Sequence, residues 1–159
     1  MNRKKYNKDN KKFLVDYMLG RLCRWMRILG IDTAYHRPED NLNIVYRSLK
    51  EKRVIITRNL KLKNSPVFGI FIIDTDSYRQ QLKEFLNKFN ITINPEKLFT
   101  RCPDCNGELA SIKKKEVKEK VPDYVYKTRK VFSICPDCRK LYWKGTHKEL
   151  IDRFLNKLL

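Results

Sequence analysis

The chain has 159 residues, and its 36 lysine and arginine residues against 18 aspartate and glutamate residues give a formal net charge of +18. The 42% hydrophobic content is sufficient for a packed core, whereas no stretch reaches the ~20 apolar residues of a membrane span. The composition therefore excludes a membrane-spanning protein, and the excess of positive charge favours nucleic acid as a partner. A general enrichment in lysine would normally raise glutamate as well.

The chain begins with a charged segment, a predicted strand and a predicted helix. Residues 1–12 contain no apolar segment, so we expect a flexible basic arm rather than a secretory signal, and a cytoplasmic protein. The apolar run 13–15 ends at Asp16 and predicts a buried strand. Residues 19–29 have helical periodicity, with Gly30 as a C-cap.

Strands and helices continue to alternate after this helix. A helix after Pro38 is expected to begin at Asp40 or Asn41 as its cap and to bury Leu42, Val45 and Leu49. The remaining elements are predicted strands over 31–35, 54–57 and 68–73, and a predicted helix over 77–89. This alternation predicts an α/β fold in which a parallel sheet is covered by helices on both faces.

The chain divides into five predicted segments. They are a basic arm over 1–12, an α/β domain over 13–90, a linker over 91–100, a zinc ribbon over 101–146 and an amphipathic C-terminal helix over 147–159. The ribbon contains a run of lysine and glutamate over 111–120, which is typical of a solvated hairpin arm or loop.

Four cysteines form two identical Cys-Pro-Asp-Cys motifs, at Cys102 and Cys105 and at Cys135 and Cys138. This spacing indicates a structural Zn²⁺ site, because four thiolates on two tight turns complete a tetrahedron and leave no open position. Two disulfides or two redox pairs are the alternatives. The lack of a secretory signal and the match between the two motifs favour zinc.

Polar side chains follow several of the predicted strands. Asp16, Asn59 and Asp74 come after strands, and Asp40 stands at the start of a helix. In a parallel sheet these positions share one edge, where acidic groups can hold Mg²⁺ or Mn²⁺ for phosphodiester hydrolysis. Asp16 is the best candidate, while a capping role alone explains Asp40.

Five motifs in order along the chain resemble those of the Mut-seven C-terminal RNase domain family. They are the residues 13–16, 19–30, 53–58, 101–105 and 142–147. The resemblance implies a PIN-like nuclease fold followed by a zinc ribbon, and a metal-dependent endoribonuclease that acts on single-stranded RNA. We expect no organic cofactor, and the sequence leaves the oligomeric state open.

The resemblance also implies a set of acidic residues around a divalent metal. Asp16 is the first acid. Counting back from Arg53 places the second at Asn41, with Asp40 one residue away, and the fourth is Asp74 or Asp76. The third position usually holds aspartate in the family and holds Asn59 here. Asparagine keeps a carbonyl oxygen but lacks the negative charge and cannot act as a base.

Basic side chains near these acids are candidates for binding RNA phosphates. They are Arg21, Arg24, Arg27, Arg58 and Arg101. A solvated helix face is the plain alternative for the first three, and Trp25 has no role beyond packing or surface contact. Three hypotheses follow: a PIN-like ribonuclease, an inactive or weakened RNA-binding relative of one, and a protein-interaction ribbon in a ribonucleoprotein.

Overall fold

The computed structural model describes residues 11–40 and 42–143. Most of the predicted arm over 1–12, the cap candidate Asn41, the end of the ribbon and the predicted helix over 147–159 lie outside these residues. Among the described helices, none combines the length and the apolar character that a membrane crossing requires.

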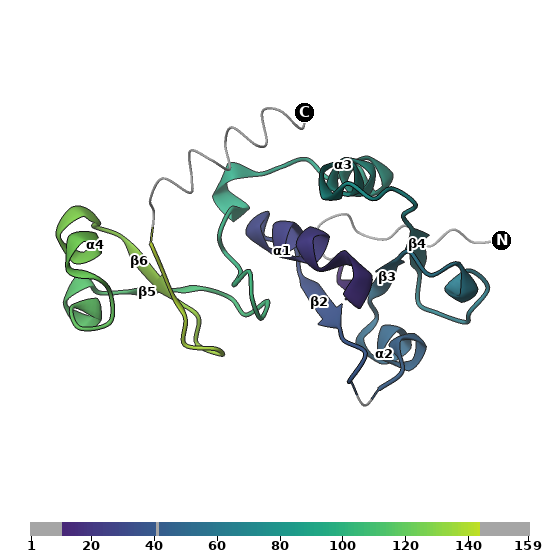
Figure 1. Cartoon of the computed structure of the whole chain (residues 1–159), viewed down its shortest axis with the longest axis horizontal. Coiled ribbons are helices and arrows are strands. Elements are labelled where there is room, and N and C mark those ends of the chain that lie inside the picture. Colours follow the sequence, from purple (N-terminus) through teal and green to yellow (C-terminus); the bar gives the residue numbers. More distant parts are fainter. Residues whose placement is uncertain (1–10, 41, 144–159) are drawn as a thin grey trace.

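The first part of the chain folds into a four-stranded parallel sheet with three helices (Figure 1). The strands are β1 (Phe13–Asp16), β2 (Thr33–His36), β3 (Val54–Thr57) and β4 (Ile70–Ile72), and the helices are α1 (Gly20–Ile28), α2 (Ile44–Glu51) and α3 (Tyr78–Phe89). A short 3₁₀ turn, Tyr17–Leu19, connects β1 to α1. The strand order is β2-β1-β3-β4, and every neighbouring pair is parallel. The predicted α/β class is confirmed.

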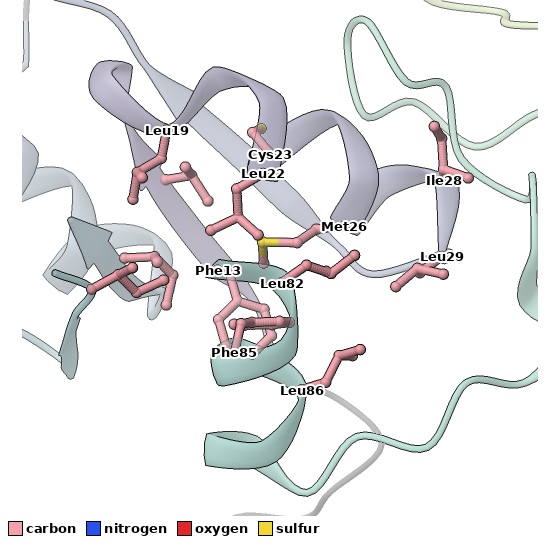
Figure 2. Close-up of a cluster of buried hydrophobic side chains, with 13 residues drawn as sticks. Phe13, Leu19, Leu22, Cys23, Met26, Ile28, Leu29, Leu82, Phe85 and Leu86 are labelled. Atoms are coloured by element: carbon pink, nitrogen blue, oxygen red, sulfur yellow. The ribbon is translucent and has the colours of Figure 1, made fainter. Parts of the chain in front are cut away.

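Helices cover both faces of this sheet, because successive side chains of a strand point to opposite faces. Phe13 and Val15 of β1 pack with α1 and α3, where Figure 2 shows Leu22, Met26 and Phe85 around Phe13. Leu14 points the other way and joins Ile44 of α2 in a second cluster. The buried strand β1 therefore lies at the centre of the domain.

Helix α2 begins later than the sequence predicts. Asn43 is its N-cap, and its side-chain oxygen accepts a hydrogen bond from the backbone N–H of Val45 at 2.7 Å. This start turns Ile44 and Ser48 toward the sheet, so that Leu42 and Leu49 are 40% and 48% exposed. The prediction that these two leucines are buried is wrong.

The second part of the chain forms a small antiparallel sheet and a short helix. Its elements are β5 (Ala110–Ile112), α4 (Asp123–Thr128), β6 (Phe132–Ile134) and β7 (Leu141–Trp143). A 3₁₀ turn, Lys114–Val117, falls in the lysine and glutamate run, and its Val117 is buried beside Val125 and Phe132. This part of the molecule therefore has a core of its own.

The segment that joins the two parts runs along the first one. Ile91, Ile93 and Leu98 pack against the core of the α/β domain. The backbone N–H of Phe99 donates to the carbonyl of Ile28 at 2.9 Å. Ile28 is the last residue of α1, and Leu29 and Gly30 follow it directly. Residues 91–100, expected to be a linker, thus contribute to the packing of the first domain.

Candidate functional site

The four cysteines of the two motifs come together in the second part of the chain. Their sulfur atoms all lie within 4.8 Å of one another, with 3.6 Å between Cys102 and Cys138 and 3.3 Å between Cys105 and Cys135. A disulfide requires about 2.05 Å, so the cysteines are free thiols. The donor set and its spacing fit a tetrahedral Zn²⁺ site.

The two motifs have the same backbone geometry. The N–H of the first cysteine donates to the carbonyl five residues later, from Cys102 to Gly107 at 2.7 Å and from Cys135 to Lys140 at 2.9 Å. In each, the residue after the second cysteine is left-handed, with φ of 76° at Asn106. A Cβ on Gly107 would lie 2.9 Å from the Cys135 sulfur, so only glycine leaves room for the cluster.

Cys102 is already biased toward its metal-binding form. Burial alone raises the pKa of its thiol, but hydrogen bonds from the Tyr142 hydroxyl and from the backbone N–H groups of Cys105 and Asp104 outweigh this and bring the pKa to about 7. The Tyr142 oxygen lies 3.0 Å from the Cys102 sulfur. A thiolate is the form that binds zinc, so these hydrogen bonds prepare the site.

Asp16 is the last residue of β1 and lies at the carboxyl edge of the first sheet. The chain adds β2 on one side of β1 and then crosses over to add β3 on the other side. The order β2-β1-β3-β4 places that switch point between β1 and β3, where parallel α/β sheets form their sites. The hydroxyl of Thr57, at the end of β3, donates to Asp16 Oδ2 at 2.6 Å, and the N–H of Tyr17 donates to Oδ1 at 2.7 Å. The carboxylate is thus held in place at 5% exposure.

The structure places Asn59 beside this pair and Asp40 in a separate ion network. The N–H of Asn59 donates to the Thr57 hydroxyl at 2.9 Å, while its side-chain oxygen caps a 3₁₀ turn by accepting from Lys61 N–H at 3.0 Å. Asp40 Oδ2 accepts from Arg47 at 3.1 Å. Both residues therefore have local structural roles.

The acids do not form a second metal cluster in the described part of the chain. The four cysteines are the one group of three or more histidine, cysteine or acidic side chains that gathers there. Asp74 is exposed, and Asp76 pairs with Arg58 at 2.6 Å. A cleft of about 1060 Å³ lies at the opposite end of β1, and its lining includes neither Asp16 nor Thr57.

A parallel α/β domain with a buried acid at its switch point is thus followed by a four-cysteine ribbon. The family model described as the Mut7-C RNAse domain matches residues 11–155. The chain belongs to the Mut7-C RNase domain family. No curated protein and no solved structure matches it. Membership of this family implies an RNA substrate.

Two of the predicted RNA-binding arginines hold the Mut7-C domain together. The Arg27 side chain is buried, and its guanidinium donates to the carbonyls of Thr33 at 2.9 Å, Pro103 at 3.1 Å and Asp104 at 2.7 Å. Arg101 donates to the carbonyl of Asn106 at 3.0 Å and is mostly buried. Both side chains are therefore turned inward to backbone carbonyls.

The other three arginines lie on the surface of the Mut7-C domain. Arg24 pairs with Asp104 at 2.5 Å, although its side chain is 59% exposed. Arg21 is exposed in the first turn of α1. The side chain of Arg58 follows β3, on the same edge as Asp16, and is 30% exposed. Arg21 is thus exposed at the surface, whereas Arg58 is partly exposed and paired with Asp76 at 2.6 Å.

Sequence reasoning missed two residues that organise the Mut7-C domain. Thr57 fixes the Asp16 carboxylate, and its position at the end of the strand beside Asp16 could have indicated that contact. Asn106 accepts a hydrogen bond from Thr33 N–H at 2.9 Å and donates to Asp32 at 2.9 Å, which docks the first cysteine motif onto the sheet. No local sequence pattern reveals a contact between residues so far apart.

Proposed function

We propose that this protein is an endoribonuclease that acts on single-stranded RNA at the carboxyl edge of its first sheet, with Asp16 as the central carboxylate. The observation that carries the proposal is the position of Asp16 at the β1–β3 switch point, in a chain that belongs to an RNase domain family. Its two hydrogen bonds fix the direction in which the remaining lone pairs point.

The donors at this edge are compatible with Mg²⁺ or Mn²⁺ bound in part by the substrate. Mg²⁺ commonly binds through one or two carboxylates and completes its shell with water and substrate phosphates. Asp16 supplies one such carboxylate, and each of its oxygens retains a free lone pair after accepting one hydrogen bond. A bound divalent ion would supply an activated water and neutralise charge on the phosphate.

The chain's own residues then bind and orient RNA. Arg58 follows β3 and Arg21 opens α1, so both cations flank the edge that holds Asp16. They attract the phosphate backbone and set its path, a contribution that weakens as salt is raised. Thr57 keeps Asp16 fixed through its hydroxyl, so the carboxylate needs no rearrangement when RNA arrives.

A second candidate function is RNA binding without efficient cleavage. This function is favoured by Asn59, which adds no negative charge beside Asp16. Its side-chain oxygen already accepts a hydrogen bond from a backbone N–H. With fewer carboxylates the divalent ion binds weakly, because each negative charge contributes to its affinity. RNA would then be retained by the arginines and not cut.

One experiment separates the two functions. The full chain and its Asp16→Asn variant are incubated with a labelled single-stranded RNA and Mn²⁺, and cleavage and binding are measured on the same samples. A nuclease loses cleavage in the variant and keeps RNA binding. Asp123→Asn, in the exposed first turn of α4, is the matched control. Binding without cleavage by the unaltered chain would establish the second function and overturn the first.

A further inference from the structure

Two large apolar side chains lie on the surface directly after Asp16. Tyr17 and Met18 belong to the 3₁₀ turn between β1 and α1, and they are 51% and 49% exposed. Leu19, the last residue of the same turn, is buried in the core (Figure 2). The turn is therefore anchored by one side chain and presents an aromatic ring and a thioether to solvent beside the candidate carboxylate.

The backbone of Tyr17 is fixed on both sides of its side chain. Its N–H donates to Asp16 Oδ1 at 2.7 Å, and its carbonyl accepts a hydrogen bond from the Tyr35 hydroxyl at 2.7 Å. Tyr35 reaches this carbonyl from β2, and Gly20 leaves it room, because a Cβ on Gly20 would lie only 3.2 Å from the Tyr35 hydroxyl. Both peptide groups of Tyr17 are thus held in place while its side chain stays exposed.

The Tyr17 ring is open to a ligand. In the part of the chain that the structure describes, no other aromatic ring and no cation stacks on it, and its printed hydrogen bonds are those of its backbone. A flat, exposed ring whose backbone cannot move is suited to stacking, because little conformational freedom remains to be lost when a ligand binds.

Exposed cations lie at the same edge of the sheet. The 3₁₀ turn Leu60–Leu62 follows β3, and Lys61 and Lys63, in this turn and directly after it, are exposed. The turn that carries Tyr17 contacts β3, which is the neighbour of β1 in the sheet. The edge that holds Asp16 therefore offers a ring for an aromatic group and lysines for phosphates, which are the two recognisable parts of a nucleotide.

We propose that the Tyr17 ring stacks on one unpaired base of an RNA strand whose phosphate lies at Asp16, with Met18 in contact with the same base. The proposal rests on the proposed action on RNA and assigns a base-binding position to it. Aromatic side chains accept bases of any sequence, because every base has a π-face. The flexible thioether of methionine adapts to bases of different shape. Bases in a duplex are already stacked on their neighbours, so this position takes single strands.

Three labelled probes separate the contribution of the base from that of the phosphates. They are a 12-nucleotide single-stranded RNA, the same RNA annealed to its complement, and a sugar–phosphate strand of the same length without bases. Binding to the full chain is measured by fluorescence anisotropy. Tyr17→Leu should weaken binding of the single-stranded RNA roughly tenfold and leave the other two affinities unchanged, because only the first probe offers an unstacked base. Tyr17→Phe keeps the ring and should bind as tightly as the unaltered chain.

Two further variants are the controls. Tyr124→Leu removes a tyrosine that is 67% exposed on α4, in the second part of the chain, and should leave all three affinities unchanged. Lys61→Gln removes a positive charge from the same edge as Tyr17 and should weaken the binding of all three probes, because each of them carries the phosphates.

The outcomes that overturn the proposal are distinct. If the chain binds the single-stranded RNA and Tyr17→Leu binds it equally tightly, Tyr17 is not a base-binding position. An equal loss for the RNA and for the strand without bases would also overturn stacking, since the lost contact would then be with the backbone. A chain that binds none of the probes would refute the proposed action on RNA itself.

Discussion

Arg27 on helix α1 donates a hydrogen bond at 2.7 Å to the backbone carbonyl of Asp104, which lies between the two cysteines of the first motif. The same guanidinium bonds to the Pro103 carbonyl and to the Thr33 carbonyl. One buried side chain thus joins the α/β domain directly to the metal-binding turn, and the geometry of each part depends on the other.

Replacing Arg27 should therefore destabilise the molecule as a whole. Arg27→Met keeps much of the apolar stem but leaves the three carbonyls without their donor, at a cost of roughly 2–4 kcal/mol in the free energy of unfolding. Urea unfolding followed by circular dichroism measures it. Arg24→Met, which removes an exposed ion pair with Asp104, should change the free energy of unfolding by less than about 1 kcal/mol. Equal losses in the two variants would contradict the role of Arg27.

Removal of zinc should unfold the small sheet first. Structural Zn²⁺ contributes about 10–16 kcal/mol in small modules, and the cluster joins the turn before β5 to the turn between β6 and β7. Hydrogen exchange after chelation should accelerate in β5, β6 and β7 well before it does in β1. Retained protection in β6 would show that the metal does not stabilise this part.

Substitution of a cysteine in the cluster should lower the metal content of the protein, whereas substitution of Cys23 should not. Burial raises the pKa of the Cys23 thiol to about 11, against a smaller lowering effect of Arg27, so Cys23 stays protonated. Elemental analysis of the purified protein should find one zinc per chain in Cys23→Ala and a clear loss in Cys105→Ser. Loss of zinc in both would mean that the fold, and not the ligand set, determines the metal content.

Asn59→Asp should strengthen divalent-ion binding at the carboxyl edge. Aspartate and asparagine are comparable caps, so the bond from Lys61 N–H should persist while a negative charge is added beside Thr57. We expect Mn²⁺ affinity, measured by calorimetry, to rise roughly tenfold or more, and RNA cleavage to rise with it.

Asn94→Asp provides the matched control for that experiment. Asn94 also caps a 3₁₀ turn, by accepting from Glu96 N–H at 2.9 Å, but it follows α3 and lies away from the switch point. It should leave Mn²⁺ affinity unchanged. Equal gains in the two variants would indicate a general effect of added charge and would remove Asn59 from the site.

Stability in acid should depend on Asp32. Burial raises the pKa of this carboxyl, but hydrogen bonds from Arg53 and Asn106 and the charges of Arg53 and Arg101 outweigh it, so the pKa is below its ordinary value of 3.8. A lowered pKa in the folded state gives stability that is complete above pH 3.8 and is lost as the pH falls further. Asp32→Asn should cost about 1–2 kcal/mol at pH 7.

The measurement is the free energy of unfolding of both proteins as a function of pH. The difference between them should shrink as the pH falls below 3.8, because protonation removes the charge that the variant lacks. A difference that stays constant across the acid range would exclude the carboxylate charge as its cause.

The sequence predicted the strands well and the contacts between distant parts poorly. The apolar run before Asp16 and the β-branched run before Thr57 identify buried strands, because those side chains are stable only inside a sheet. The two Cys-Pro-Asp-Cys motifs predicted the cluster through their spacing. The start of α2 was wrong because Asp40, Asn41 and Asn43 are all suitable caps, and propensity alone cannot choose among them.

The arginines of α1 show the same limit at the candidate site. Periodicity separates Arg24 and Arg27 from the apolar face of the helix, but it does not reveal that another part of the chain covers Arg27 and leaves Arg24 59% exposed. Arg27 became buried because residues 76 and 77 positions later fold back over it. A charged helix face in a sequence can therefore be either a ligand surface or an internal contact.

The two cysteine motifs have the same Cys-Pro-Asp-Cys sequence but lie in different structural surroundings. Pro103 is buried against the α/β domain, whereas Pro136 in the second motif is exposed. A substitution scan would therefore tolerate changes at one proline and reject them at the other, although an alignment of the two motifs treats them alike. A spectroscopic label that reports on the metal should therefore be attached at the second motif, because a change there leaves the contact between the first motif and the α/β domain intact.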